Sequence, residues 1–129
     1  MIIQYAEKTQ TRRFASRLRR PKKQDLKTKS LKVLLSKHAG RSHGKVTLHH
    51  QGGRHKRYYR MIDFKRDKFD VAGKVVGLEY DPNRNVDIAC VQYEDGDKRY
   101  ILAPSGLKAG DKVLSSQKMV EVRLGNTTA

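Results

Sequence analysis

The stretch that decides the fold is residues 74–102, which read KVVGLEYDPNRNVDIACVQYEDGDKRYIL. Three runs within it are rich in Val, Ile, Leu and Tyr and predict strands, at 74–80, 86–93 and 99–102. Asp81-Pro82-Asn83 predicts the first turn, because proline presets the backbone and asparagine tolerates the left-handed region. Asp95-Gly96 is a strong signal for a two-residue hairpin turn. The stretch therefore predicts three consecutive strands joined by tight turns.

Further strand signals flank this stretch on both sides. Alternating or apolar residues predict additional short strands, at 45–49, 58–65, 113–114 and 120–124. Because so many short strands follow one another closely, we predict a mainly β fold, a small five-stranded OB-type barrel over residues 45–124. Residues 1–44 show no sustained apolar period, so we expect an extended basic N-terminal arm with one short helical turn or docking point at 31–35.

The single cysteine and the apolar runs exclude two classes of protein. Cys90 lies between Ala89 and Val91, so a disulfide framework is excluded and a buried small hydrophobic side chain is expected. No apolar run approaches the roughly 20 residues that a membrane-spanning helix needs. We therefore expect no membrane partner.

Positive charge is concentrated in the first half of the chain. The formal net charge is +16, far above what solubility requires, which indicates a polyanionic partner. Residues 1–66 hold 20 Lys and Arg against 3 acidic residues, whereas residues 67–129 hold 9 against 10. We therefore expect the residues that bind the polyanion to lie in the first half of the chain. Met1 to Arg20 also loosely resembles an organelle transit peptide, and we interpret it as a retained extension held by a phosphate-rich partner.

The most informative stretch for chemistry is 39–66, where basic residues are interleaved with glycines and rings. Lys and Arg neutralise phosphates, and glycines let the backbone approach a sugar-phosphate chain. Tyr and His rings stack on unpaired bases, and Tyr58, Tyr59, His50 and His55 are our candidates for that role. The alternative is a solvated basic loop, which a single Lys-Arg cluster would favour.

We predict RNA contacts for the basic arm, for this stretch and for the turn after 81–83. The predicted residues are Arg12, Arg13, Arg17, Arg19, Arg20, Lys22, Lys23, Arg41, His43, Lys45, His50, Gly52, Gly53, Arg54, His55, Lys56, Arg57, Tyr59, Arg60, Lys65, Arg66 and Arg84. Arg84 has a structural alternative, which is a local ion pair with Asp81 or Asp87.

Metal, cofactor and catalytic sites find no support in the pattern. Zinc usually takes four ligands, often with Cys pairs, and the five His residues carry no familiar ligand spacing. No phosphate-binding glycine loop of the nucleotidase or dinucleotide kind is present. His43 beside Ser42 is a sequence neighbour and not a catalytic triad. We therefore predict no metal, no cofactor and no enzyme activity.

Several motifs in a fixed order resemble the large ribosomal subunit protein two family, in its bacterial and organellar form. They read GR at 40–41, GKVT at 44–47, HQGGRHKR at 50–57, YR at 59–60, IDFKR at 62–66, EYDPNR at 79–84, DG at 95–96, KRYILAP at 98–104 and GLKAGD at 106–111. The match covers about residues 31–126.

The resemblance implies an OB-type barrel that binds large-subunit ribosomal RNA near the peptidyl-transferase region and supports subunit assembly and association, while catalysis belongs to RNA. The resemblance also implies that other proteins of the large ribosomal subunit are partners. The family's RNA-contacting positions carry over to Arg41, His50, Gly52, Gly53, His55, Lys56, Arg57, Arg60, Lys65, Arg66 and Arg84.

Departures from the family pattern affect one loop and the length. The family usually has three consecutive glycines where this chain has Gly52, Gly53 and Arg54, and its Gly-Gly-Arg-Asn-Asn motif is here 39–43, AGRSH. The family continues into a second barrel and a basic tail, so residues 125–129 resemble the start of a linker. We therefore expect a separate chain that supplies the second barrel and tail. A split gene and a divergent basic leader favour the mitochondrial matrix, with bacterial cytoplasm or a plastid as alternatives.

Two rival classes remain distinct from a ribosomal constituent. A free single-strand-binding module or RNA chaperone would bind generic oligonucleotides and would not co-sediment with large subunits. A His-dependent nuclease would cleave RNA and lose that activity when His43 or His55 is changed.

Overall fold

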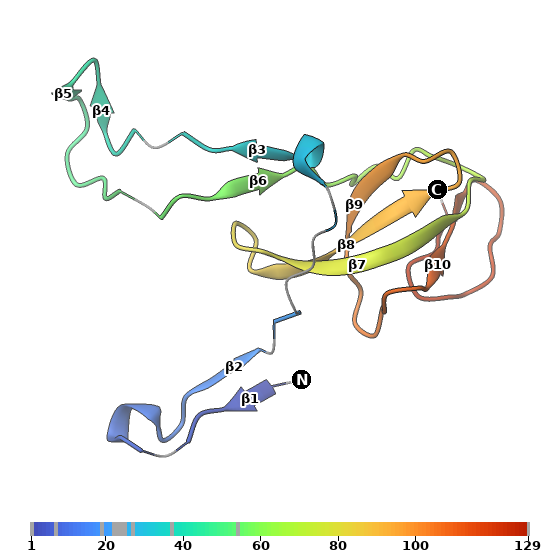
Figure 1. Ribbon diagram of the computed structural model, residues 1–129, viewed down its shortest axis with the longest axis horizontal. Helices are drawn as coiled ribbons and strands as arrows, with labels where there is room; N and C mark the ends of the chain where they lie inside the picture. The colour runs from blue at the N-terminus through green and yellow to red at the C-terminus, as the bar shows by residue number, and fades with distance from the viewer. Residues whose placement is uncertain are drawn as a thin grey trace.

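The computed structural model describes residues 2–6, 8–18, 20–21, 26, 28–36, 38–53 and 55–128. At its centre is a four-stranded antiparallel sheet in the order β10-β7-β8-β9 (Figure 1). Its strands are β7 (Gly73–Asp81), β8 (Val86–Tyr93), β9 (Lys98–Leu102) and β10 (Lys112–Val113). The three strands predicted within residues 74–102 are therefore confirmed, each to within one residue at either end.

The two predicted turns also form, although the left-handed residue of the first is Asn85 and not Asn83, and the second has residues 94–96 between the hydrogen-bonded Tyr93 and Asp97 instead of two residues. In the β7–β8 turn, Asn83 N–H donates to the Asp81 carboxylate at 3.0 Å, and Asn85 adopts the left-handed φ of 57°. In the β8–β9 turn, Gly96 has a φ of 85° and its N–H donates to the Tyr93 carbonyl at 3.0 Å. Glycine and asparagine tolerate positive φ, so the turn chemistry explains why the strands reverse here.

The sheet buries apolar side chains on both of its faces. One cluster contains Val75, Ala89, Val91, Tyr93, Ile101, Leu107 and Val113. The other contains Leu26, Ile88, Cys90 and Tyr100. Alternate residues of β8 therefore enter opposite clusters, because successive side chains of a strand point to opposite faces. Cys90 is fully buried and burial raises the pKa of its thiol, so its predicted role as a small hydrophobic side chain is confirmed.

The second cluster is covered by chain that precedes the sheet, at Leu26, Leu31 and Ile62. Ile62 forms a parallel bridge to Tyr100, and Asp63 N–H donates to the Tyr100 carbonyl at 2.8 Å. The Tyr100 hydroxyl lies 2.6 Å from Thr28 Oγ1, and both residues are buried. The predicted mainly β, OB-type fold is therefore confirmed, although the expected fifth strand is reduced here to the Ile62 bridge.

Three strand predictions outside residues 74–102 were only partly right or wrong. The strand expected at 58–65 is β6 (Tyr58–Arg60), and the one at 45–49 is β5 (Lys45–Val46), which pairs outside the central sheet. No strand forms at 120–124. There the Asn126 side chain accepts from Leu114 N–H at 2.9 Å and donates to the Glu121 carbonyl at 3.0 Å, so a side chain takes the hydrogen bonds that a strand partner would make. The nearby pairing is instead β11 (Ser115–Ser116) with β12 (Thr127–Thr128).

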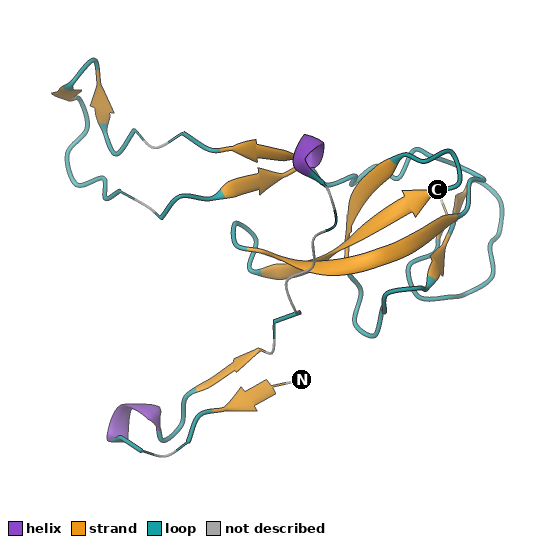
Figure 2. Cartoon of the chain, viewed as in Figure 1, coloured by secondary structure: helices purple, strands orange, loops and turns teal. Residues whose placement is uncertain are grey.

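Two ribbons extend away from the barrel (Figures 1 and 2). The first pairs β1 (Ile2–Gln4) with β2 (Ser16–Leu18), and a short 3-10 helix at Gln10–Arg12 lies between them. The second begins after a 3-10 turn at Lys29–Leu31 and pairs β3 (Lys32–Leu34) with β6. The helical turn expected at 31–35 was therefore only partly right, because the observed turn shares Leu31 alone with it and residues 32–34 form β3. The described part of the chain contains no helix that is long and apolar enough to cross a membrane.

The tight packing of the barrel core can be tested by a substitution at Gly73. A Cβ atom there would lie 2.4 Å from Val91 Cγ1 and 3.2 Å from the Tyr93 ring, both in the core. We expect Gly73→Ala to lower the free energy of unfolding by about 1–3 kcal/mol, because a tightly packed core resists added volume. Urea unfolding followed by circular dichroism would measure this. Gly52→Ala is the matched control, since no atom lies within 4 Å of its added Cβ, and a loss of equal size there would contradict the packing argument.

Candidate nucleic-acid interface

The long ribbon formed by residues 32–60, which we call the finger, carries most of the predicted RNA-contacting residues. Its stem is the β3–β6 pair, in which Lys32 faces Arg60, Val33 faces Tyr59 and Leu34 faces Tyr58. Its tip is the hairpin of β4 (Arg41–Ser42) and β5, which Figure 1 shows far from the central sheet. The sequence builds this projection because the segment contains too little apolar surface to form a core of its own.

The tip is shaped by tight backbone turns. His43 and Gly44 have φ values of 48° and 76°, which allow β4 to reverse into β5. The Gly40 carbonyl accepts the N–H groups of Thr47 and Leu48 at 2.8 and 3.0 Å. A Cβ on Gly40 would lie 2.2 Å from the Leu48 carbonyl oxygen, and the φ of Gly40 is 70°. The tip therefore requires glycine at residue 40.

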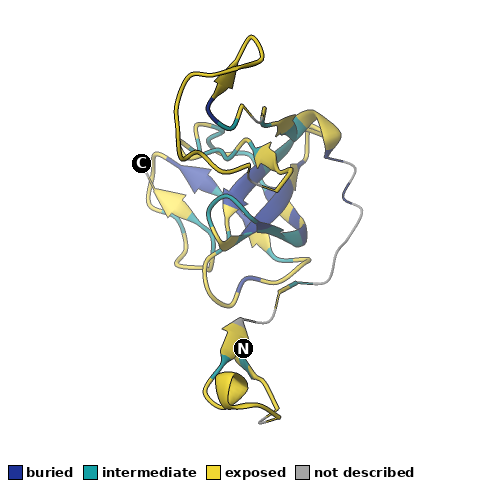
Figure 3. Cartoon of the chain, turned by 90° about the vertical axis from the view of Figure 1, so that its left-hand side faces the viewer, coloured by how far each residue is buried: buried dark blue, intermediate teal, exposed yellow. Residues whose placement is uncertain are grey.

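The distal finger is exposed and free of acidic groups. Every described residue from 41 to 59 is exposed (Figure 3), and no Asp or Glu occurs between Asp25 and Asp63. Val46 and Leu48 are 52% and 60% exposed, so apolar surface accompanies the positive charge. The predicted residues that the structure gathers here are Arg41, His43, Lys45, His50, Gly52, Gly53, His55 and Lys56. Exposed cations suit the phosphates of a nucleic acid, aromatic rings suit its unpaired bases, and glycines let the sugar-phosphate chain approach closely.

The base of the finger is fastened to the barrel by the β7–β8 turn. Asn83 Nδ2 donates to the Tyr58 carbonyl at 2.8 Å, and Arg57 donates to the Pro82 carbonyl at 3.1 Å. On the adjacent strand, the Glu79 carboxylate pairs with Lys32 at 2.9 Å and with Arg60 at 3.4 Å. These contacts join both strands of the stem to β7 and its turn, so they fix the direction in which the finger leaves the barrel.

Arg84 is the most heavily engaged residue at this base. Its Nη1 donates to the Asp81 carboxylate at 2.6 Å, and its Nη2 donates to the Tyr59 hydroxyl at 2.8 Å. The guanidinium also lies 4.8 Å from the Tyr59 ring centroid and 5.7 Å from that of Phe64. Asp81 is fully buried, so its carboxylate needs this cation. The Asp81 pair considered as the structural alternative is therefore present, and an RNA contact by Arg84 stays a prediction.

The remaining predicted residues lie in other places. Arg12, Arg13, Arg17 and Arg20 belong to the N-terminal ribbon or the segment that follows it. Lys65 is exposed next to the barrel, while the Arg66 guanidinium donates to Ser115 Oγ at 3.1 Å and to the Gly125 carbonyl at 2.9 Å. The predictions for Arg19, Lys22, Lys23 and Arg54 lie outside the described residues. The candidate interface is thus a set of surfaces and not a single pocket.

Acidic residues at the far end of the barrel are largely matched by local cations. Arg99 pairs with Asp63 at 2.8 Å and with Asp67 at 2.5 Å, and Lys68 pairs with Asp95 and Asp97. The bond from Arg99 lowers the pKa of Asp67, and the bond from Lys68 lowers the pKa of Asp95. Charge in this region is therefore internally balanced, and the unbalanced positive charge is left to the finger and arm.

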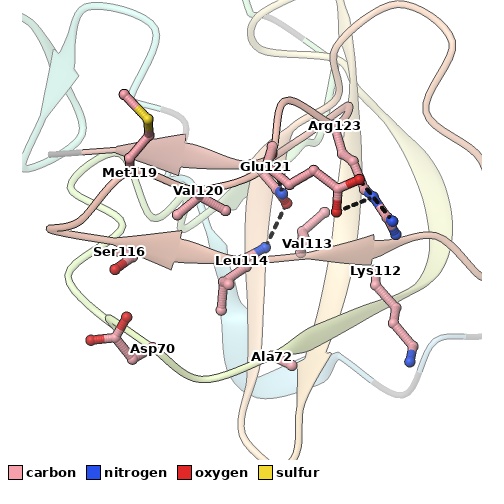
Figure 4. Close-up of a pocket in the computed structure, with 11 residues that line it drawn as sticks. Asp70, Ala72, Lys112, Val113, Leu114, Ser116, Met119, Val120, Glu121 and Arg123 are labelled. Carbon is pink, nitrogen blue, oxygen red and sulfur yellow. Dashed lines mark hydrogen bonds and ion pairs between the residues drawn. The ribbon is translucent and has the colours of Figure 1, made fainter.

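A groove of about 470 Å³ near the C-terminal end of the chain differs from the finger in its lining residues (Figure 4). It lies beside β10 and β11 and is bordered by Met119, Val120 and Glu121. Glu121 pairs with Arg123 at 2.9 Å, and no aromatic side chain lines the groove. Among the described residues there is also no group of three or more His, Cys, Asp or Glu placed to hold a metal ion. The groove therefore lacks the rings of the finger, and of its two cations, Lys112 and Arg123, the second is already paired with Glu121.

Sequence reasoning missed the residues that position the interface. Glu79, Asp81 and Asn83 hold the finger, although Asp81 was considered only as a turn residue and a local partner of Arg84, Asn83 only as a turn residue and Glu79 only as part of a strand and a family motif. One signal was available, because carboxylates within a strand otherwise rich in Val and Leu indicate paired, buried charge. Tyr5 and Tyr80 were also not selected, and both line a pocket near the N-terminal ribbon.

Removing the cation at the base should expose its structural role. We expect Arg84→Ala to lower the free energy of unfolding by about 2–4 kcal/mol, because the buried Asp81 carboxylate loses its closest partner. Thermal and urea unfolding would measure the change. Arg41→Ala, which removes an exposed cation at the tip, is the matched control and should change stability by less than about 0.5 kcal/mol. Equal stability of the two variants would contradict a structural role for the Arg84–Asp81 ion pair.

Comparison with known proteins agrees with this geometry. Residues 28–115 match the family model described as Ribosomal Proteins L2, RNA binding N-terminal domain, and this range contains the finger and all four strands of the central sheet. A relative from Rhizobium rhizogenes (strain K84 / ATCC BAA-868), the large ribosomal subunit protein uL2, is 57% identical over 100 residues, which are 77% of this chain and 36% of the relative. The chain thus spans about a third of the length of that protein. By these matches, together with its OB-type barrel and basic finger, the chain belongs to the L2 family of ribosomal proteins, in the part that forms the family's RNA-binding N-terminal domain.

Proposed function

We propose that the chain is a structural constituent of the large ribosomal subunit that binds ribosomal RNA through the finger and the basic arm. The observation that carries this proposal is the exposed distal finger, which bears cations, rings and glycines but no carboxylate. Among the described residues, no ion pair joins a cation of the distal finger to a carboxylate. A polyanion would neutralise the finger's charge, and stacked bases would cover its exposed apolar and aromatic side chains.

The OB-type barrel serves in this proposal as a mount that sets the finger's direction. Asn83 and Arg84 of the β7–β8 turn bond to the stem, and Arg57 of the finger bonds to the turn. These contacts hold the tip at a fixed angle to the barrel. Preorganised phosphate and base contacts lose less conformational entropy on binding than contacts made by a free basic tail. No step of this role requires catalysis by the protein.

We propose a position near the peptidyl-transferase region, a contribution to subunit assembly and association, and contacts with other large-subunit proteins. We also propose a division into an RNA-embedded arm at 1–44, a barrel at 45–124 and the start of a linker at 125–129, with residues 45–60 forming part of the finger. A separate chain carrying a second barrel, and a mitochondrial location, are further predictions, while the relative described above is bacterial.

Sedimentation tests the ribosomal role directly. A tagged copy of the chain should co-migrate with large subunits on a sucrose gradient, and mass spectrometry of that fraction should find other large-subunit proteins. The same fraction would reveal a chain that supplies the second barrel. Migration only in the light fractions, together with equal affinity for unrelated oligonucleotides, would support a free RNA chaperone instead. RNA cleavage that depends on His43 or His55 would support a nuclease.

The salt dependence of RNA binding tests the finger. We expect Arg41→Ala, Lys45→Ala and Lys56→Ala each to lower the slope of log K against log salt by roughly 0.7–0.9, because each removes one phosphate-neutralising cation. Filter binding of a large-subunit ribosomal RNA fragment at several salt concentrations would measure the slope. Lys108→Ala removes an exposed cation from a barrel loop outside the finger and is the matched control. Slopes that fall equally for Lys108→Ala would contradict an interface centred on the finger.

A further inference from the structure

A second pocket lies between the N-terminal ribbon and the β7–β8 turn of the barrel. Its volume is about 600 Å³, which lies within the range of roughly 300–1,000 Å³ typical of ligand sites. From the N-terminal side it is lined by Tyr5, Arg17 and Arg20. From the barrel it is lined by Tyr80, Asn85 and Asp87, among others. Residues that precede the family match therefore meet residues within it, since Tyr5, Arg17 and Arg20 lie before residue 28.

The pocket is built from flat π surfaces and guanidinium groups. The Arg20 guanidinium lies 4.2 Å from the centroid of the Tyr80 ring. The Arg17 guanidinium lies 5.5 Å from the centroid of the Tyr5 ring, and that of Arg12 lies 5.9 Å from it. These distances are within the range of cation–π attraction, so each wall pairs an aromatic ring with a cation. A planar ligand that carries negative charge suits both components at once.

Polar groups at the barrel side can read the edge of such a ligand. The Tyr80 hydroxyl donates to Asn85 Oδ1 at 2.6 Å, which orients the Asn85 amide. Asp87 and Ser105 also line this side and offer a carboxylate and a hydroxyl. Base edges carry both donors and acceptors, whereas phosphates only accept, so the carboxylate suits a base amino group and the guanidinium groups suit the phosphate.

We propose that this pocket holds one unpaired nucleotide of an RNA strand, with its base against the Tyr5 and Tyr80 rings and its phosphate at Arg17 and Arg20. The proposal rests on the RNA-binding function proposed above and adds to it a stacking site that is separate from the finger. It also gives the N-terminal ribbon a role beyond charge neutralisation. Paired bases are excluded, because a base must leave its stack to enter a pocket of this size.

The test compares single-stranded and duplex RNA on the full chain. Fluorescence anisotropy would measure the affinity of a labelled single strand of 12 nucleotides and of the matching duplex. We expect Tyr80→Leu and Tyr5→Leu each to weaken single-strand binding by about 5- to 100-fold and duplex binding by less than twofold, because only an unpaired base can stack on the rings. Tyr80→Phe keeps the ring and should retain binding to within about threefold.

Phe14→Leu is the matched control. Phe14 is a 91% exposed aromatic residue of the same ribbon that does not line the pocket, so its loss should change neither affinity by more than about twofold. Equal weakening of single-strand and duplex binding by Tyr80→Leu, or no weakening of either, would overturn the site. Free AMP should compete only at far higher concentration than the single strand, and competition at similar concentration would overturn the assignment to an RNA strand.

A measurement on the unaltered protein keeps the proposal testable if a variant fails to fold. Ultraviolet crosslinking to a single strand containing 4-thiouridine, followed by mass spectrometry, should yield crosslinked peptides that contain Tyr5 or Tyr80. Crosslinks confined to the finger would overturn the pocket while leaving the proposed function intact. Absence of binding to any RNA at low salt would overturn the proposed function itself.

Discussion

The fully buried carboxylate of Asp81 is the constraint on which the arrangement of barrel and finger depends. A buried charge is tolerated only when it is paired and hydrogen-bonded, and Asp81 satisfies this with Arg84 at 2.6 Å, Arg60 at 3.8 Å and the Asn83 N–H at 3.0 Å. Because Arg60 belongs to the finger and Arg84 to the β7–β8 turn, meeting the needs of one carboxylate joins the two parts. The Tyr59 hydroxyl and ring then complete the contact through Arg84.

This arrangement separates two uses of positive charge in the same protein. Cations at the base of the finger are paired with Glu79, Asp81 or backbone carbonyls and maintain the shape of the molecule. Cations at the tip are exposed and have no acidic residue nearby in the sequence, so their charge is available to a polyanion. The barrel beyond is internally balanced by the Arg99 and Lys68 pairs. A ribosomal role requires this division, because a scaffold must fold while it still presents unpaired cations.

Much of the fold could be predicted because its signals are local. The strands of residues 74–102 and their two turns follow from β-branched residues and from Asn and Gly placed where positive φ is needed. The strand expected at 120–124 failed for a non-local reason. The Asn126 side chain, from outside this segment, bonds to the Leu114 N–H and to the Glu121 carbonyl instead. The candidate site was predicted as a basic, ring-bearing stretch, but not its separation into tip, base and N-terminal ribbon.

By itself the sequence determined the barrel's central strands, the placement of charge in the first half and the family, because composition, periodicity and ordered motifs are properties of the chain alone. Only the tertiary structure decided which cations are exposed to a polyanion and which form ion pairs with the protein's own carboxylates. Arg57 meets Pro82, Arg84 meets Tyr59, and Tyr5 shares a pocket with Tyr80 across long stretches of chain. Such pairings depend on the path of the backbone in three dimensions, and residue type and spacing do not encode that path locally.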